Sequence, residues 1–334
     1  MSLGLELGLT GIPRGPVLAW ATPGDGYVPL GGITAFTRAD AATCATYVDS
    51  SRVRQTVLAN VLRDAHYIGG IRTILLESER ANRQTKSQNI TTAGGLYTAQ
   101  SGMTTTTGQA DAAAGTNATL LTQGVGGSSA VWRAVVPVGD GTKGCGLDIK
   151  QGNFTQQEFG ILDDTAGSWR HRVRATWAAG VPTLSSQSNP ALLLPPIQLT
   201  NGWWRALWAA GGVIAANTNR FFLFNNVADD VGKTGLFCGL SVEDAAFPAS
   251  YIATDAAAVT RAVDALTFGG VVAPGTATLY YRYYDLATGT WTDVAAAYTS
   301  AAPIVPPVDR AYRAIAVLNG SLTAAQCRTL LGYA

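Results

Sequence analysis

The sequence predicts an all-β protein: an antiparallel β-sandwich of the jelly-roll type with an extended N-terminal arm and a short C-terminal strand-plus-helix segment. From Ala130 to Glu243, seven strand-like runs follow one another at regular spacing, each bounded by Gly, Asp or Asn. No helical period of about ten or more residues lies between them, so each strand must turn back on its neighbour. The 38 glycines and the charged fraction of only 13% in 334 residues suit short strands joined by tight turns.

The first part of the chain, residues 1–83, is expected to form an arm and β-hairpins that serve docking or oligomerisation. Met1–Val28 is rich in Gly and Pro, which predicts an extended arm that becomes ordered only on another surface. Ile33–Val53 combines strand-forming residues with an Asp-Ser-Ser turn signal and predicts a hairpin. Thr56–Leu76 predicts a second strand pair around Gly69-Gly70.

Residues 84–264 are assigned to the jelly-roll sandwich. Thr91–Gly127 is rich in Thr, Ala and Gly, a composition that also occurs in disordered segments. Apolar residues recur there between turn signals, and Thr suits the solvated face of a sheet. Short exposed strands are therefore the favoured interpretation of this stretch.

The stretch Gly235–Asp264 ends the sandwich. Alternating apolar residues predict one strand face, formed by Leu236, Cys238, Leu240 and Val242. Pro248 cannot donate a ladder hydrogen bond and holds the residue before it extended, so the chain is expected to leave the sheet here. Residues 247–252, with the sequence FPASYI, are named the strap. The strap is expected to tie the sandwich to the C-terminal segment rather than to form a binding site.

Residues 265–334 are expected to hold three strands and a closing helix. The strands are predicted at Ala277–Asp285, Thr290–Val294 and Tyr312–Leu318. Thr323 and Gln326 have the spacing of a helix capping box, and Gly332 ends the helix. Leu322 and Cys327 have the spacing of a hydrophobic staple.

Composition and charge narrow the classes of partner. The formal net charge is +1 and no basic stripe stands out, so nucleic-acid binding is not expected. The N-terminus lacks a basic region followed by an apolar run, and no apolar span of about 18 residues occurs. We therefore expect neither a secretion signal nor membrane insertion, and we expect synthesis in a cytoplasm. Few charges and many small residues favour a homo-oligomer whose surfaces are covered by neighbours.

Neither the cysteines nor the paired carboxylates predict a metal site or a cofactor. The cysteines are scattered in apolar or small-residue surroundings and are expected to be free buried thiols: Cys44, Cys145, Cys238 and Cys327. Carboxylate pairs lie at strand ends: Asp163-Asp164, Asp229-Asp230 and Glu243-Asp244. Jelly rolls hold structural calcium at such places, but no D-x-D-x-D-G loop is present and Asp readily caps turns. Turn capping is therefore the favoured role.

Tryptophan is the residue type that points to a ligand, because a jelly roll binds sugars by stacking pyranose rings on flat aromatic side chains. The chain offers Trp132, Trp169, Trp177, Trp203, Trp204, Trp208 and Trp291. Trp204 and Trp208 share one strand face and Trp203 takes the other. Core packing is the competing interpretation for each of them. Trp169 and Trp203 are the candidate glycan-binding residues.

The sequence does not predict an enzyme, and no catalytic residue is nominated. The only histidines, His66 and His171, are too few for a three-histidine metal site, and no G-x-S-x-G motif occurs. No cysteine is followed by a plausible local base. A glycosidase needs only two separated carboxylates, so a glycan depolymerase is the alternative hypothesis.

Three segments resemble a family of phage-encoded virion proteins built around a concanavalin-like jelly roll of the carbohydrate-binding-module type. The first resembles the family's opening: Phe36-Thr37-Arg38-Ala39, Ala45-Thr46-Tyr47-Val48-Asp49, Ala59-Asn60-Val61, Leu75-Leu76-Glu77 and Arg80-Ala81-Asn82. The second, similar to an NGWYR strand, is Asn201-Gly202-Trp203-Trp204-Arg205. The third is similar to a QLEEGAFPTSYIPT…VTRAAD pattern: Glu243, Ala246-Phe247-Pro248, Ser250-Tyr251-Ile252, Thr254, Val259-Thr260-Arg261-Ala262 and Asp264.

The resemblance implies a structural protein of a phage or phage-like particle, assembled in the host cytoplasm and displayed on the virion. Its partners would be other virion proteins, copies of itself and a host-surface polysaccharide. Members of the family occur in tail fibres, tail spikes, head fibres and capsid decorations. Thr91–Ser129 has no clear counterpart in the family, and the resemblance does not choose among these locations.

Overall fold

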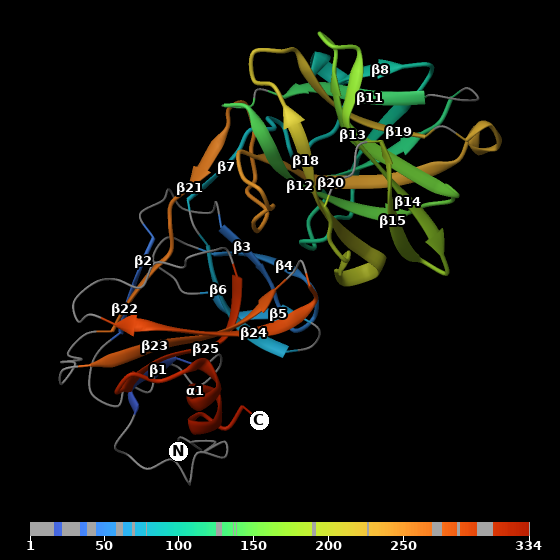
Figure 1. Cartoon of the computed structure of the whole chain (residues 1–334). Coiled ribbons are helices and arrows are strands. Elements are labelled where there is room, and N and C mark those ends of the chain that lie inside the picture. The colour runs from blue at the N-terminus through green and yellow to red at the C-terminus, as the bar shows by residue number, and fades with distance from the viewer. Residues whose placement is uncertain are drawn as a thin grey trace. The chain divides into compact units, whose positions relative to one another are not determined.

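The computed structural model divides the chain into two compact units (Figure 1), each described by itself. The sandwich unit comprises Ala41–Thr56 and Arg80–Arg261, and the sheet–helix unit comprises Met1–Asp40, Val57–Glu79 and Ala262–Ala334. The structure describes residues 17–21, 34–38, 45–57, 63–68, 71–77, 79–124, 129–135, 137, 139–188, 192–225, 227–268, 276–285, 288–298 and 310–333.

The sandwich unit is built from two antiparallel sheets. In the nine-stranded sheet the order is β16-β18-β12-β20-β10-β9, with β17 on β18, β7 on β20 and β21 on β7. Its strands are β7 (Arg80–Asn82), β9 (Thr104–Gln109), β10 (Ala118–Thr122), β12 (Gly141–Gln151), β16 (Leu192–Leu193), β17 (Ile197–Gln198), β18 (Trp203–Val213), β20 (Thr234–Glu243) and β21 (Val259–Arg261).

The six-stranded sheet has the order β15-β14-β13-β19-β11-β8. Its strands are β8 (Thr98–Gln100), β11 (Ser129–Val135), β13 (Gln156–Asp163), β14 (Ser168–Ala178), β15 (Val181–Ser188) and β19 (Asn219–Asn225). Short 3-10 turns lie at η1 (Ala93–Gly95), η2 (Thr200–Gly202) and η3 (Ala228–Asp230), and β3 (Ala45–Val48) pairs with β4 (Arg54–Val57).

This architecture confirms the predicted all-β, jelly-roll-like sandwich. All seven predicted runs are strands, namely β11, β12, β13, β14, β18, β19 and β20. The Thr-rich stretch holds the short strands β8, β9 and β10, of which β8 and most of β9 are exposed. Strand β15 was not predicted, because its sequence VPTLSSQS has few of the large apolar residues that reveal a half-buried strand.

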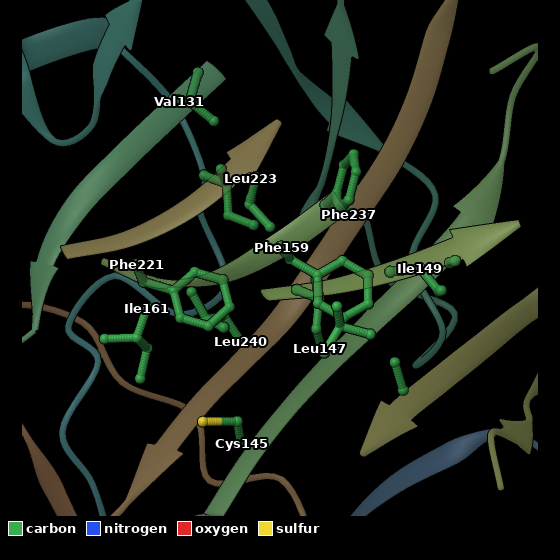
Figure 2. Close-up of a cluster of buried hydrophobic side chains, with 14 of the residues drawn as sticks. Val131, Cys145, Leu147, Ile149, Phe159, Ile161, Phe221, Leu223, Phe237 and Leu240 are labelled. Carbon is green, nitrogen blue, oxygen red and sulfur yellow. The ribbon is translucent and has the colours of Figure 1, made fainter. Parts of the chain in front are cut away.

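The core of the sandwich lies between the two sheets (Figure 2). Leu147 and Ile149 of β12 belong to one apolar cluster with Phe159 of β13 and Phe221 of β19, and all four side chains are buried. Period-two alternation on each strand sends these residues to a common interior, since successive side chains point to opposite faces of a sheet. Each buried side chain of this size contributes about 1.5 to 3 kcal/mol to folding.

Strand β20 departs from the simple alternation that its sequence predicts. One extra residue lies between the pairs Cys238–Asp148 and Ser241–Gly146, and Gly239 has a φ of 61°. This β-bulge reverses the faces, so Leu240 points into the main core whereas Cys238 packs on the outer side of the sheet. The single apolar face predicted for the strand is therefore wrong.

The strap follows β20 without strand structure, and most of its residues are buried against the outer side of the nine-stranded sheet. The Tyr251 ring of the strap lies against two arginines: the guanidinium carbons of Arg54 and Arg205 are 4.3 and 5.4 Å from its centre. Asp148, which is fully buried, forms ion pairs with both arginines. The strap thus covers a charged network instead of leaving it in water.

Replacing Gly144 of β12 with Ala is expected to lower the free energy of unfolding by about 2 kcal/mol, because the strap must move. A Cβ at this position would lie 2.4 Å from the carbonyl carbon of Phe247, and backbone yields less readily than a side chain. Urea unfolding of the full chain measures the effect. Gly211→Ala is the matched control, since no atom lies within 4 Å of its Cβ; equal stability of the two variants would contradict the prediction.

The sheet–helix unit holds a sheet of order β24-β23-β25-β6-β5, with β1 also paired to β25. Its strands are β1 (Val17–Ala21), β5 (Arg63–Ile68), β6 (Ile71–Leu76), β23 (Ala277–Asp285), β24 (Thr290–Tyr298) and β25 (Arg310–Asn319), and β2 (Thr34–Thr37) pairs separately with β22 (Ala265–Phe268). Helix α1 (Ala324–Leu330) begins at the predicted capping box of Thr323 and Gln326. The partners of the predicted staple, Leu322 and Cys327, lie in one apolar cluster.

Segments that the sequence assigned to separate ends of the chain form this one unit. Strands β5 and β6 pair as predicted, but β6 then joins β25 near the C-terminus. Within the predicted arm, β1 is the described part, and it also pairs with β25. In the predicted hairpin of residues 33–53, β2 instead pairs with β22. In the described part of the chain, no helix is long and apolar enough to cross a membrane.

Candidate glycan-binding face

Trp203 does not display its ring, contrary to the sequence expectation. Its side chain is 0% exposed and packs with Leu199, Cys238 and two alanines. It does lie on the opposite face of β18 from Trp208, which is in the main core. Those alanines are far from Trp203 in the sequence: Ala118 begins strand β10 of the same sheet, and Ala112 lies in the turn before it. Core packing, the competing interpretation, holds for this residue.

Trp169 lies on the outer side of the six-stranded sheet, in a cluster of four large aromatic side chains. This cluster is named the aromatic face and consists of Trp132, Trp169, Phe222 and Phe224. Phe222 and Phe224 are buried beneath the tryptophans, which are only half-buried. Large apolar rings gathered on the outer side of a sheet, with part of their surface open to water, mark a candidate binding surface.

The aromatic face is assembled by strand register. Phe221 and Leu223 of β19 point into the core, so Phe222 and Phe224, which alternate with them along the strand, point outward. Trp132 pairs directly with Phe222 across the β11–β19 ladder. Their ring centres are 6.0 Å apart.

A bulge in β14 brings Trp169 to this face. Arg170 is the extra residue between the pairs Ile161–His171 and Leu162–Trp169. Strict alternation would place Trp169 on the same side as His171, in the core, and the bulge turns it outward. Its ring then stacks on Phe224, with centres 5.2 Å apart and an interplanar angle of 24°.

Three arginines surround the rings and are named the arginine rim: Arg172, Arg174 and Arg220. The Arg220 guanidinium carbon lies 3.9 Å from the centre of the Trp132 ring, and that of Arg172 lies 4.9 Å from the centre of Phe224. Arg172 and Arg174 both pair with Glu158, whose side chain is 0% exposed. Stacked rings next to N–H donors are what a pyranose needs, since its flat apolar side covers a ring and its hydroxyls accept hydrogen bonds.

The paired carboxylates act as acceptors within turns, as the sequence indicated. Although burial opposes it, hydrogen bonds from Asn217, the Ala166 N–H and Arg170 lower the pKa of Asp163 to about 2. Asp230 accepts from Thr155, Asn225 and Lys233. Among the residues that the structure describes, no group of three or more His, Cys, Asp or Glu side chains could hold a metal ion.

The cysteines whose surroundings are described are free and buried, which confirms the prediction for Cys145, Cys238 and Cys327; Cys44 lies outside the described residues. Burial raises the pKa of each of the three thiols. The thiolate is the nucleophilic form of cysteine, so these side chains are chemically inert in the folded protein.

Several of the residues that carry the family resemblance form buried structural contacts within each unit. In the sandwich unit, the Asn82 side chain bonds Leu240, Val242 and the strap residue Ile252, and Thr46 bonds the carbonyl of Tyr251. In the sheet–helix unit, Asp264 lies 3.8 Å from Arg38 and accepts the backbone N–H of Glu77. These motif residues therefore hold the architecture together.

No protein-family model and no curated protein matches the chain. Among solved structures, the chain is similar to an arabinose-bound α-L-arabinofuranosidase, with a TM-score of 0.32 and 14% identity over 63% of this chain. The chain covers 31% of the length of that enzyme. A TM-score this low supports no conclusion about fold or activity.

Proposed function

We propose that this chain is a non-enzymatic structural protein of a phage or phage-like particle, displayed on the virion, whose sandwich adheres to host-surface glycan. The observation that carries the adhesive role is the aromatic face, where the half-buried ring of Trp169 stacks on Phe224. A prestacked ring is held flat without further loss of side-chain entropy when a sugar binds. The nearby guanidiniums supply hydrogen-bond donors.

The virion role is supported by the family resemblance. Its first and third segments, far apart in sequence, meet through the side chain of Asn82 and the backbone of residues 240–252. The proposal includes other virion proteins and copies of the same chain as partners. Immunogold labelling of intact particles tests it directly, since the label must appear on head, neck or tail; particles that assemble and carry no label would contradict it.

Trp169→Ala is expected to weaken binding to host capsule or lipopolysaccharide at least about tenfold, because aromatic stacking contributes about 1 kcal/mol or more in addition to buried area. The measurement is a pull-down or biolayer binding curve with the full chain. Trp291→Ala is the matched control: its half-buried ring packs on Tyr284 in the sheet–helix unit, with centres 5.4 Å apart. Thermal unfolding checks that both variants are folded.

Two outcomes would overturn this function. Undiminished binding by a folded Trp169→Ala variant would remove the aromatic face from the contact. Release of reducing ends from the glycan on incubation with the protein would instead identify a depolymerase. Two carboxylates lie on the arginine rim: guanidinium groups bind both oxygens of Glu158, and Asp164 pairs with Arg220. These ion pairs leave both carboxylates poorly suited to deliver a proton to a leaving group.

A further inference from the structure

We propose that the aromatic face selects acidic glycans, with Arg172 and Arg174 binding the carboxylate of a sugar whose ring stacks on Trp169. This inference rests on the proposed adhesive function and specifies the chemical class of its ligand. The class is a polysaccharide with one carboxylate on each sugar residue, such as a polyuronate.

The charges at the centre of the arginine rim do not balance. Arg172 and Arg174 share one carboxylate, that of Glu158. The neighbouring arginines have carboxylates of their own, Arg170 pairing with Asp163 and Arg220 with Asp164. Among the described residues, one positive charge therefore remains uncompensated next to the Trp169 ring.

Both arginines bind Glu158 with the same edge. Nε and Nη2 of Arg172 donate to Oε2, the first at 2.8 Å, and Nε and Nη2 of Arg174 approach Oε1 at 2.7 and 2.6 Å. In the part of the chain that is described, no hydrogen bond to Nη1 of either arginine is present. Each guanidinium has five N–H groups, so an edge containing Nη1 stays available for a second carboxylate.

The available edges face water while the bound carboxylate is buried. Glu158 is 0% exposed, whereas the side chains of Arg172 and Arg174 are 22% and 31% exposed. The buried carboxylate fixes the planes of the two guanidiniums, which lowers the entropy lost when they bind a ligand. A guanidinium binds a carboxylate with two parallel hydrogen bonds, a geometry that hydroxyls do not match.

Arg172 places this positive charge beside the Trp169 ring, on which the sugar would stack. Its guanidinium carbon lies 5.8 Å from the centre of the Trp169 ring. A pyranose stacked on that ring carries its exocyclic carboxylate at its own edge, within reach of the arginine beside it. A single uncompensated charge and a net charge of +1 fit isolated sugar carboxylates better than a nucleic-acid backbone, whose binding depends on many cationic contacts.

The test compares polygalacturonate with the same polymer after complete methyl esterification, using the full chain. Wild-type protein is expected to bind the acid form at least about tenfold more tightly, since a charge-assisted hydrogen bond contributes about 1.5 kcal/mol or more. Arg174→Gln is expected to abolish most of this preference for the acid form. Arg328→Gln, which removes a 48% exposed arginine of helix α1, is the matched control and should keep the full preference.

Each remaining outcome is decisive. Equal binding of the acid and ester forms overturns the acidic-glycan inference, while the adhesive function stands if Trp169→Ala still loses binding. Competition by polyglutamate as strong as that by polygalacturonate would show a general polyanion site and also overturns the inference. If wild-type protein binds neither polymer nor any host glycan, the proposed function itself fails. Arg174→Lys serves as a second variant that keeps the positive charge. Because an ammonium group cannot form two parallel hydrogen bonds with a carboxylate, this variant should retain only part of the preference for the acid form.

Discussion

Asn82→Asp is expected to lower the free energy of unfolding by about 4 kcal/mol or more, since it buries an unpaired charge and breaks two hydrogen bonds. The Asn82 amide group donates to the carbonyls of Leu240 and Ile252 at 3.0 and 2.7 Å, and its oxygen accepts the N–H groups of Val242 and Gln84 at 3.0 and 3.1 Å. In the aspartate, a second oxygen would face the two carbonyl oxygens. Strand β20 and the strap would then lose their common anchor.

Urea unfolding of the full chain measures this loss. Asn89→Asp is the matched control, because it makes the same chemical change at an exposed position and should shift stability by less than about 0.5 kcal/mol. A folded Asn82→Asp variant as stable as this control would show that the resemblance segments do not support the sandwich through Asn82. Trp169→Ala, in contrast, should reduce glycan binding more than stability, because its ring is only half-buried.

The sandwich is expected to lose about 2 to 3 kcal/mol of stability between pH 7 and pH 4.5 because of His171 alone. The imidazole is 0% exposed and stacks on Trp208 with centres 6.1 Å apart. Within the described residues, neither ring nitrogen has a hydrogen-bond partner. Burial lowers its pKa from 6.5 to about 4. Between these values the unfolded chain binds a proton that the folded chain does not, so stability falls as the pH falls through this window.

His171→Phe is expected to flatten this acid dependence, because phenylalanine keeps an aromatic ring against Trp208 and cannot bind a proton. The measurement is the free energy of unfolding of both proteins at pH 7 and pH 4.5. The pKa of Asp163 is lowered to about 2, so its contribution is lost mainly below about pH 4 and does not interfere. An equal acid loss in both proteins would assign the effect to other groups.

Much of the fold follows from local sequence patterns. The apolar run in NRFFLFNN, bounded by Asn, predicted strand β19, and the capping box at Thr323 and Gln326 predicted the start of helix α1. Both are short-range signals, since they depend on the composition of one short run or on contacts within one turn of a helix. The all-β class and the antiparallel sandwich follow from the same kind of signal repeated along the chain.

The candidate site was predicted only in part. Trp169, a candidate from the sequence, lies half-buried on the outer side of the sheet, and its role in glycan binding stays a prediction. Trp132, Phe222 and the arginine rim were not nominated. Alternation in β19 does show that Phe222 and Phe224 share a face, and that signal could have been used. Nothing local shows that Arg172 and Arg174 meet one buried carboxylate, because Glu158 comes from the neighbouring strand β13.

The sequence by itself determined which runs of residues form strands, where these strands end in turns and how the last helix begins. The tertiary structure alone decided which faces are covered: a bulge at Arg170 turned Trp169 outward, and the segment containing Ala112 and Ala118 buried Trp203. The physical reason is that periodicity defines two faces of a strand without distinguishing them. An inserted residue exchanges the faces, and only contacts with distant segments determine which face meets water.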